Sequence, residues 1–278
     1  MSEGPRGARE GEIRLIVTAD DFGAAPAVNE AVEQGFRGGI LTAASLMVSG
    51  AAADDAVARA RTMPGLGVGL HVVLTDGTPI LPPERVPALV GKNGRFHDSM
   101  LRTALAIALS PAARAEMRAE VEAQFAAFAA TGLPLDHVNA HKHFHLHPMI
   151  ASAILASGRK YGLKAIRVPA ELGANPVHNW WARLLGQRLK RAGMLVNDRV
   201  VGLRDTGHFS ETRMAKAVST LRPGLTELYC HPATGSGWTG AAPGYRYRLE
   251  LDALTAPAVR EALTLRGVKT GNFASQAG

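Results

Sequence analysis

The sequence is poor in the features that mark secreted, membrane-spanning and nucleic-acid-binding proteins. Its 278 residues include one cysteine, Cys230, so an internal disulfide is excluded. No run of about 18 apolar residues is present, and the polar start MSEGPRGAREGEI lacks the apolar segment of a secretory signal. Aromatic residues make up only 5%, and no RNA-binding or helix-turn-helix signature is present. These absences predict a cytoplasmic protein that does not bind nucleic acid.

The composition is that of a folded, basic protein. Hydrophobic residues account for 46% and charged residues for 20%, which excludes intrinsic disorder of the whole chain. Lys and Arg number 31 against 24 Asp and Glu, a formal net charge of +7. Such a charge favours anionic partners, and without a nucleic-acid motif these are phosphorylated ligands or an anionic membrane face.

Short apolar runs alternate with helical patterns along most of the chain. This alternation predicts parallel strands joined by helices, and the length suits one (β/α) barrel. No composition break marks a second domain, and no Gly-rich phosphate loop follows the first strand. We therefore expect a flexible tail at 1–11 and a single α/β barrel domain at 12–278. Its seven or eight mostly parallel strands are expected near 13–17, 41–48, 68–74, 135–140, 165–168, 200–203, 227–230 and 267–270.

Polar side chains stand near the carboxyl ends of the expected strands, where the active sites of such barrels lie. They are distant in sequence but should converge on one opening. Asp together with two or more His suits a catalytic divalent metal, because three protein ligands leave positions for water and substrate. The residues concerned are Asp20, Asp21, His71, Asn139, His141, His143, His145, Arg167 and His231.

The segment 137–147 holds five histidines in eleven residues, all at odd positions. While the chain stays extended, odd residues share one face, so His141 and His143 would both point inward. A helical conformation would instead pair His141 with His145. A solvated surface cluster is the alternative, but this density of His favours metal binding or catalysis.

Asp20 and Asp21 are neighbours on a strand and should point in opposite directions, so we expect different roles. One carboxylate would bind metal and the other would handle a proton. A turn or helix cap is the alternative explanation for this pair. Cys230 should face away from the site if His231 faces it, which makes it a small core residue rather than a nucleophile.

Four motifs carry a family resemblance: Thr-Ala-Asp-Asp-Phe-Gly at 18–23, Gly-Leu-His at 69–71, Asn-Ala-His-Lys-His-Phe-His at 139–145 and Cys-His-Pro-Ala at 230–233. In order and spacing the chain resembles the YdjC-like carbohydrate deacetylases over roughly residues 13–273. The stretches 40–48, 133–147 and 243–248 look closest to the hopanoid-biosynthesis-associated branch. The chito-oligosaccharide-phosphate branch has Ser and His where this chain has Ala140 and Lys142.

The resemblance implies a hydrolase of the glycoside hydrolase/deacetylase-like barrel type that removes an acetyl group from an N-acetylated sugar. An N-acetylglucosaminyl hopanoid lipid is the expected substrate, with a chito-oligosaccharide or its phosphate as the alternative. The family's metal triad falls on Asp21, His71 and His141, its general base on Asp20 and its general acid on His231. The cofactor would be one divalent metal ion, magnesium or zinc, with manganese and cobalt also compatible.

Two other functions compete with this one. A phosphoesterase or amidohydrolase on a His-rich barrel would use two metals and usually a His-x-His on the first strand, which here carries Asp20 and Asp21. A non-enzymatic metal- or sugar-binding protein would not need an Asp and a His beyond three ligands.

Substrate-binding residues are expected around the metal. His143 and His145 come from the His-rich segment, and Arg167 would orient Asp20 or the substrate, or form a salt bridge at a strand end. Trp238 lies among glycines in the loop after His231 and would stack on a sugar, with Tyr245 nearby. An ordinary loop anchor is the alternative for Trp238.

Residues 178–193 form an amphipathic helical pattern. Apolar residues lie on one half and Arg183, Lys190 and Arg191 on the other. A barrel helix that packs on the sheet explains the pattern, and so does a helix that lies in a membrane interface. The latter would place the protein at the inner membrane face. A homodimer is also compatible with the sequence. The apolar residues are Trp180, Trp181, Leu184, Leu185 and Leu189.

Overall fold

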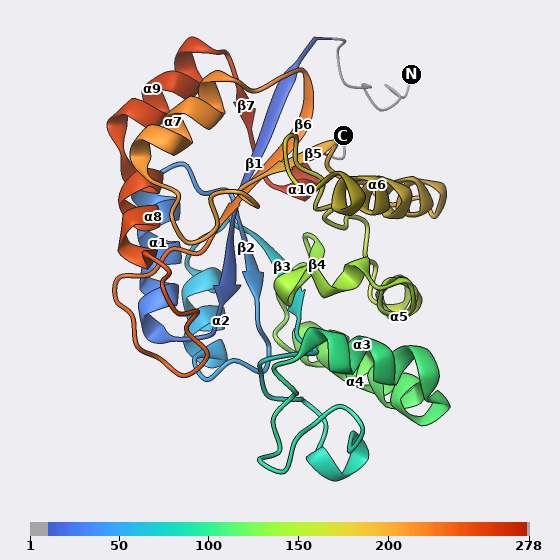
Figure 1. The fold of residues 1–278 in the computed structure, drawn as a ribbon. Coiled ribbons are helices and arrows are strands. Elements are labelled where there is room, and N and C mark those ends of the chain that lie inside the picture. The colour runs from blue at the N-terminus through green and yellow to red at the C-terminus, as the bar shows by residue number, and fades with distance from the viewer. Residues whose placement is uncertain (1–10, 277–278) are drawn as a thin grey trace, which may run out of the picture.

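The computed structural model describes residues 11–276, so all but the last residue of the expected tail at 1–11, together with residues 277 and 278, lie outside it. Six parallel strands form a continuous path in the order β4-β3-β2-β1-β6-β5, and β7 pairs with β1. Their carboxyl ends point the same way (Figure 1). The strands are β1 (Ile13–Phe22), β2 (Ala43–Leu46), β3 (Gly67–Val72), β4 (Val138–Ala140), β5 (Arg199–Val201), β6 (Gly224–Cys230) and β7 (Lys269–Thr270).

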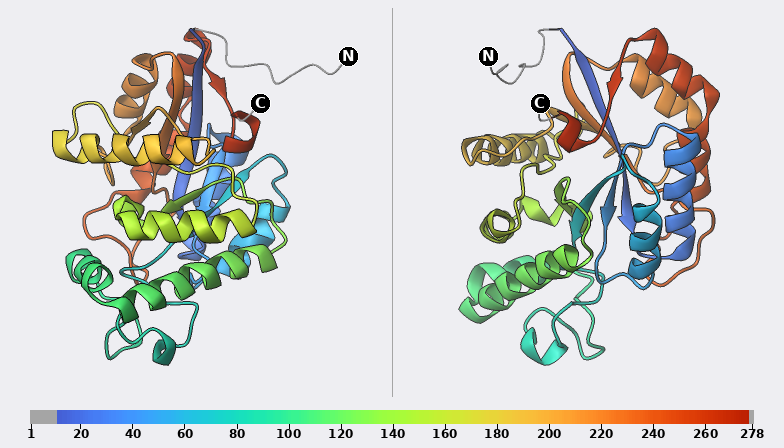
Figure 2. Two further views of the ribbon diagram at one scale, coloured as in Figure 1. Left: turned by 90° about the vertical axis from the view of Figure 1, so that its right-hand side faces the viewer. Right: turned by 180° about the vertical axis from the view of Figure 1, so that it is seen from behind.

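The helices cover the outside of this curved sheet. In Figure 1, α1, α2, α7, α8 and α9 lie on one side and α3 to α6 on the other, and Figure 2 shows the same layers from two further directions. The helices are α1 (Pro26–Gly38), α2 (Ala53–Arg61), α3 (Met100–Leu109), α4 (Pro111–Ala130), α5 (Pro148–Lys160), α6 (Pro176–Arg191), α7 (Glu211–Ser219), α8 (Tyr247–Thr255), α9 (Pro257–Leu265) and α10 (Phe273–Gln276), with 3₁₀ turns η1 (Pro83–Arg85) and η2 (His141–Leu146). No helix within 11–276 is long and apolar enough to span a membrane.

Local sequence explains where these elements begin. Five of the helices start on a proline at the first position, where its fixed φ suits a helix and its missing N–H costs nothing. Ser99, Ser110 and Ser210 cap α3, α4 and α7 by accepting a backbone N–H three residues on. The strand β1 is central because its apolar run is buried against β2 on one side and β6 on the other.

The α/β fold with parallel strands is confirmed, but the continuous ladder is a half-barrel and not the full (β/α) barrel that the sequence predicts. The expected strand at 165–168 makes only isolated bridges, from Ile166 to β4 and from Ala165 to Leu195. The reason is local. The Asn197 side chain accepts a hydrogen bond from the Val168 N–H and donates one to the Val168 carbonyl, at 2.8 Å each. The next residue, Pro169, has no N–H to offer a ladder.

Gly67 and Gly69 of β3 leave room for the polar side chains of Asp136 and His137 inside the half-barrel. A Cβ on Gly69 would lie 2.5 Å from the His137 ring, which is itself fully buried. We expect Gly69→Ala to lower the free energy of unfolding by about 1–3 kcal/mol, the usual cost of overpacking. Urea unfolding would measure it. Gly38→Ala at the end of α1 is the control, since nothing lies within 4 Å of its Cβ position. Equal stability of both variants would contradict the packing argument.

Candidate active site

The two neighbouring carboxylates at the end of β1 lie in different surroundings. The pairing of β1 with β2 shifts register between Ala19 and Phe22, and Asp21 adopts a positive φ of 64°. Asp20 is 2% exposed inside the half-barrel, whereas Asp21 is partly exposed and lines a cavity at the carboxyl ends of the strands. A left-handed φ is rare for a non-glycine residue and accounts for the separation of the two side chains.

Asp21, His71 and His141 converge on one point. Asp21 Oδ1 lies 3.3 Å from His71 Nε2 and 3.3 Å from His141 Nδ1, and the two ring nitrogens are 3.4 Å apart. Ligands about 2.1 Å from one ion at tetrahedral angles are separated by about 3.4 Å, so the triangle fits a single divalent ion. Asp21 Oδ1 is also buried without a hydrogen-bond partner among the described residues, as expected of an atom directed at a metal.

The His71 ring is oriented by Asn139. His71 Nδ1 lies 2.6 Å from Asn139 Oδ1, so Nδ1 carries the proton and Nε2 presents its lone pair to the triad. The Asn139 amide is held in turn, because its Nδ2 donates to Asp20 Oδ1 and to Ser45 Oγ at 3.0 and 2.8 Å. Asn139 was expected at the site only as a strand-end polar residue, and its role as a support for His71 emerges from the structure.

The triad is electrostatically suited to a cation. Burial opposes ionisation of Asp21, but His141 and His71 outweigh it and hold the pKa of the carboxyl well below its ordinary value. Asp21 is therefore an anion at neutral pH. Within 11–276 this is the one group of three or more His, Cys, Asp or Glu side chains with metal-binding spacing. A second metal, as the phosphoesterase hypothesis requires, has no corresponding cluster there.

Arg167 ties Asp20 to a second carboxylate. Its Nη1 and Nη2 donate to the two Asp20 oxygens at 2.5 and 3.0 Å, and Nη2 also donates to Glu227 Oε1 at 2.8 Å. The side chain is 0% exposed and its guanidinium lies 4.7 Å from the centre of the Tyr229 ring. Of the roles expected for Arg167, the structure shows the contact with Asp20. Because Arg167 is fully buried, it would act on a substrate indirectly, by orienting Asp20.

The Asp20 carboxylate is ionised and fixed in place. Burial raises its pKa, but the charges of Arg167 and His71 and the hydrogen bonds from Arg167 bring it far below the ordinary value. Three hydrogen bonds, two from Arg167 and one from Asn139, set its orientation. A carboxylate has about four acceptor sites, so one remains, on Oδ2, for a further hydrogen bond in a fixed direction.

The His-rich segment is not extended beyond Ala140, because Lys142 and His143 take positive φ values of 53° and 55° within η2. The extended conformation assumed for His141 and His143 is therefore wrong, but both side chains still lie at the site, His141 against Asp21 and His143 against Tyr229. The Lys142 ammonium binds Asp76 at 2.7 Å. The helical alternative also fails to pair His141 with His145, because the latter is 1% exposed and contacts the Arg167 carbonyl at 3.1 Å.

His143, Tyr229, His231 and Tyr245 form a chain of edge-to-face rings beside the carboxylates. Neighbouring centroids are 5.2, 5.6 and 5.3 Å apart. His143 Nε2 lies 3.2 Å from Tyr229 Oη. The pKa of His145 is lowered to about 3 by burial and by the Arg167 charge, so its ring is neutral.

His231 follows β6 and is held by a residue that the sequence did not single out. Its backbone N–H donates to Glu250 Oε2 of α8 at 2.5 Å. Its ring is close enough to Asp20 and Asp21 to lower the pKa of both, and its buried Nδ1 has no hydrogen-bond partner among residues 11–276. A glutamate in the otherwise apolar inner face of α8 is the signal that could have identified Glu250.

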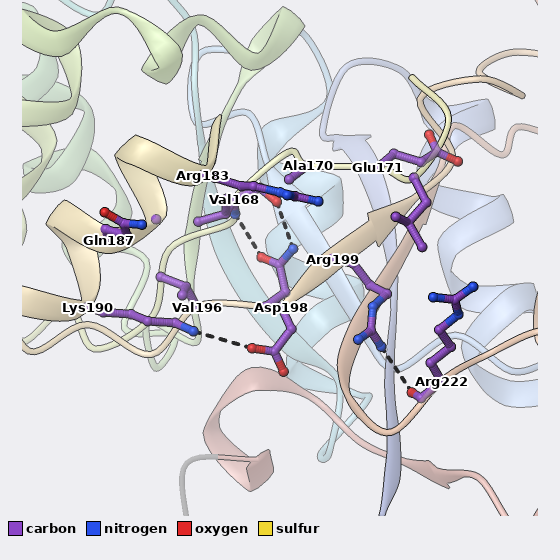
Figure 3. Close-up of a pocket in the computed structure, with 13 residues that line it drawn as sticks. Val168, Ala170, Glu171, Arg183, Gln187, Lys190, Val196, Asp198, Arg199 and Arg222 are labelled. Atoms are coloured by element: carbon purple, nitrogen blue, oxygen red, sulfur yellow. Dashed lines mark hydrogen bonds and ion pairs between the residues drawn. The ribbon is translucent and has the colours of Figure 1, made fainter. Parts of the chain in front are cut away.

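A cavity of about 210 Å³ opens onto the triad through Asp21 and His141. Trp238 lines it from the loop after β6 and also packs on Tyr247, with ring centroids 4.6 Å apart. Arg95 also lines this cavity. A larger cavity of about 380 Å³ lies between α6 and β5, and none of the expected site residues lines it (Figure 3). The smaller cavity is therefore the candidate active site.

Comparisons with known proteins identify the family of the chain. The chain is 30% identical to a chitooligosaccharide deacetylase from Serratia marcescens, over 93% of this chain and 97% of the relative. It is 32% identical to a carbohydrate deacetylase from Mus musculus, over 92% and 93%. A crystal structure of a candidate cellobiose-phosphate cleavage protein from Enterococcus faecalis superposes with a TM-score of 0.77 at 25% identity, over 95% and 99%. The family model described as YdjC-like protein matches residues 14–265, and the chain belongs to this family.

Proposed function

We propose that this protein is a metal-dependent hydrolase that removes the acetyl group from an N-acetylated sugar. The observation that carries the proposal is the triangle of Asp21, His71 and His141 beside the separate, fixed carboxylate of Asp20. The deacetylase names of relatives that span almost the whole chain support the same reaction. A non-enzymatic metal-binding protein would not need Asp20 and His231 next to the triad.

Asp21, His71 and His141 would hold one divalent ion. When bound there, the ion supplies Lewis-acid activation of a water molecule and of the amide carbonyl. Asp with two His accepts zinc, magnesium, manganese or cobalt, and zinc and magnesium are our first expectations. Asn139 keeps the His71 ring in the orientation that this role requires.

Asp20 and His231 would carry the protons. Water adds to the carbonyl carbon, the C–N bond breaks, and acetate and a free amine are formed. The Asp20 carboxylate accepts the proton of the attacking water, and the His231 imidazolium gives a proton to the leaving nitrogen. Arg167 positions Asp20, and the Glu250 contact positions the backbone of His231.

We propose an N-acetylglucosaminyl hopanoid lipid as the substrate, with a chito-oligosaccharide or its phosphate as the alternative. Ala140 and Lys142, where the chito-oligosaccharide-phosphate branch has Ser and His, favour the lipid. Mass spectrometry after incubation with each substrate would test both. Loss of one acetyl group from the lipid alone is the expected result. Loss from neither substrate, with a divalent metal bound, would refute the proposed reaction.

Trp238 is expected to bind the sugar. In Trp238→Ala we expect KM to rise about 2- to 10-fold with kcat little changed, because an aromatic contact contributes about 0.5–1.5 kcal/mol. Trp238→Phe is the matched control and should keep most of the affinity. Since Trp238 also packs on Tyr247, thermal unfolding should be recorded for both variants. An unchanged KM with a lower Tm would show that Trp238 only anchors its loop.

A further inference from the structure

The exposed large hydrophobic side chains are gathered in two segments. Nine such side chains occur among the described residues, and eight of them lie in 101–109 and 172–184. The ninth, Leu265, is at the end of α9. Surface hydrophobic residues scattered singly are normal, but a contiguous group of them marks an interaction site. The eight are Leu101, Leu105, Leu109, Leu172, Val177, Trp180, Trp181 and Leu184.

In α6 the apolar residues divide between two faces. Ala182, Leu185 and Leu189 are buried against the half-barrel, as expected for an outer helix. Val177 and Trp180 are 73% and 59% exposed, so packing on the sheet does not explain them. In α3 the same division holds, since Ile107 is buried while the exposed leucines recur every four residues. Each helix therefore presents an uncovered apolar stripe.

Both helices reach the segment that follows the metal triad. Trp181 Nε1 donates to the Leu146 carbonyl at 2.7 Å, and the backbone of Ala104 in α3 lies beside the His147 ring. Leu146 ends η2, which begins at His141. In Figures 1 and 2, α3 and α6 lie on either side of α5, which follows η2 directly. The two helices that carry the apolar stripes thus lie on either side of the segment that follows the His-rich turn η2.

Positive charges predominate around these stripes. Residues 100–115 and 172–191 contain six Arg or Lys and no Asp or Glu, and Glu116 and Glu171 lie directly beside these ranges. The cavity between α6 and β5, of about 380 Å³, adds to this charge, because four cations and two anions line it (Figure 3). In the figure Lys190 is paired with Asp198, and Arg183 extends from α6 over the cavity. The cavity's charged residues are Arg183, Lys190, Arg199, Arg222, Glu171 and Asp198.

We propose that α3 and α6 together bind the surface of an anionic lipid bilayer. Trp and Leu side chains facing outward among Lys and Arg are typical of helices that lie in the membrane interface. The cations would attract anionic lipid headgroups, and this attraction extends from the membrane surface over about one Debye length. Resting on the proposed deacetylase function, the same surface would bring the acetylated sugar of a membrane lipid to the site. Bilayer binding itself does not depend on that function.

Sedimentation with vesicles tests the proposal. We expect the protein to pellet with phosphatidylglycerol-containing vesicles at low ionic strength, and much less with pure phosphatidylcholine or in about 0.5 M salt. The variant Leu105→Ser/Trp180→Ser should lower the partition coefficient about 10- to 100-fold, because each buried apolar side chain contributes substantially to partitioning. Leu265→Ser is the matched control, since Leu265 is 80% exposed and lies outside both segments, and it should bind like the wild type.

Three results would overturn the proposal. The first is wild-type protein that stays in the supernatant at low salt, and the second is equal loss of binding in Leu265→Ser. The third is a homodimer of the wild type that becomes monomeric in Leu105→Ser/Trp180→Ser without any vesicle binding, which would assign the surface to a second copy. Turnover of a water-soluble N-acetylated oligosaccharide should be the same in all three proteins. Failure of that turnover alone would count against the deacetylase function and not against bilayer binding.

Discussion

His71→Ala is expected to lose both the metal and the activity. His71 Nε2 is one corner of the triangle with Asp21 and His141, and two remaining ligands cannot hold an ion in the same geometry. Disturbing residues that only support metal ligands weakens binding about 10- to 100-fold, so loss of a ligand should cost more than about 100-fold. Elemental analysis of the purified protein and acetate release would measure the two effects.

The control for this variant is His208→Ala, which removes an exposed imidazole far from the triad in sequence. It should keep the metal and the turnover of the wild type. His71 is buried, so thermal unfolding must show that His71→Ala is folded at the assay temperature. Full metal occupancy in a folded His71→Ala protein would contradict the assignment of the triad.

The convergence of Asp21, His71 and His141 could be predicted because topology imposes it. Parallel strands place their carboxyl ends at one edge, and β1, β3 and β4 are close neighbours in the sheet, so residues at or just after their ends must approach one another. The same argument places Asp20 and His231 at this edge. Strand alternation thus gathers the candidate residues, the family resemblance supplies their expected roles, and neither gives the distances between them.

Other features depended on contacts that no periodicity reveals. Glu227 lies in the middle of β6 and Glu250 in α8, and only the folded chain shows that they meet Arg167 and His231. The two left-handed residues after His141 end the extended conformation that the sequence pattern predicts for this segment. The sheet remains a half-barrel because the Asn197 side chain replaces ladder hydrogen bonds in the segment 165–168, which the sequence predicts as a strand.

Asp20→Asn is expected to keep the metal and lose turnover about 10²- to 10⁴-fold, the usual contribution of a general acid or base. The amide has the shape of the carboxylate but cannot accept the proton of water. The change also removes the negative charge that pairs with Arg167, and breaking a buried ion pair typically costs about 3–5 kcal/mol of stability. A loss of turnover would therefore be ambiguous without a variant that weakens the same cluster in another way.

Glu227→Gln supplies that comparison. It removes the other carboxylate bound to Arg167, with a similar expected cost in stability, and leaves Asp20 in place. We expect its turnover to stay within about tenfold of the wild type, well short of the loss assigned to a proton acceptor. Metal content, Tm and kcat of the two variants should be compared at one temperature below both transitions. Equal losses of turnover in the two variants would mean that Asp20 matters for the structure of the Arg167 cluster and not as a proton acceptor.

Near-normal turnover of metal-bound Asp20→Asn would place the proton acceptor elsewhere. His145 would be a poor substitute, because it is buried and contacts the Arg167 backbone.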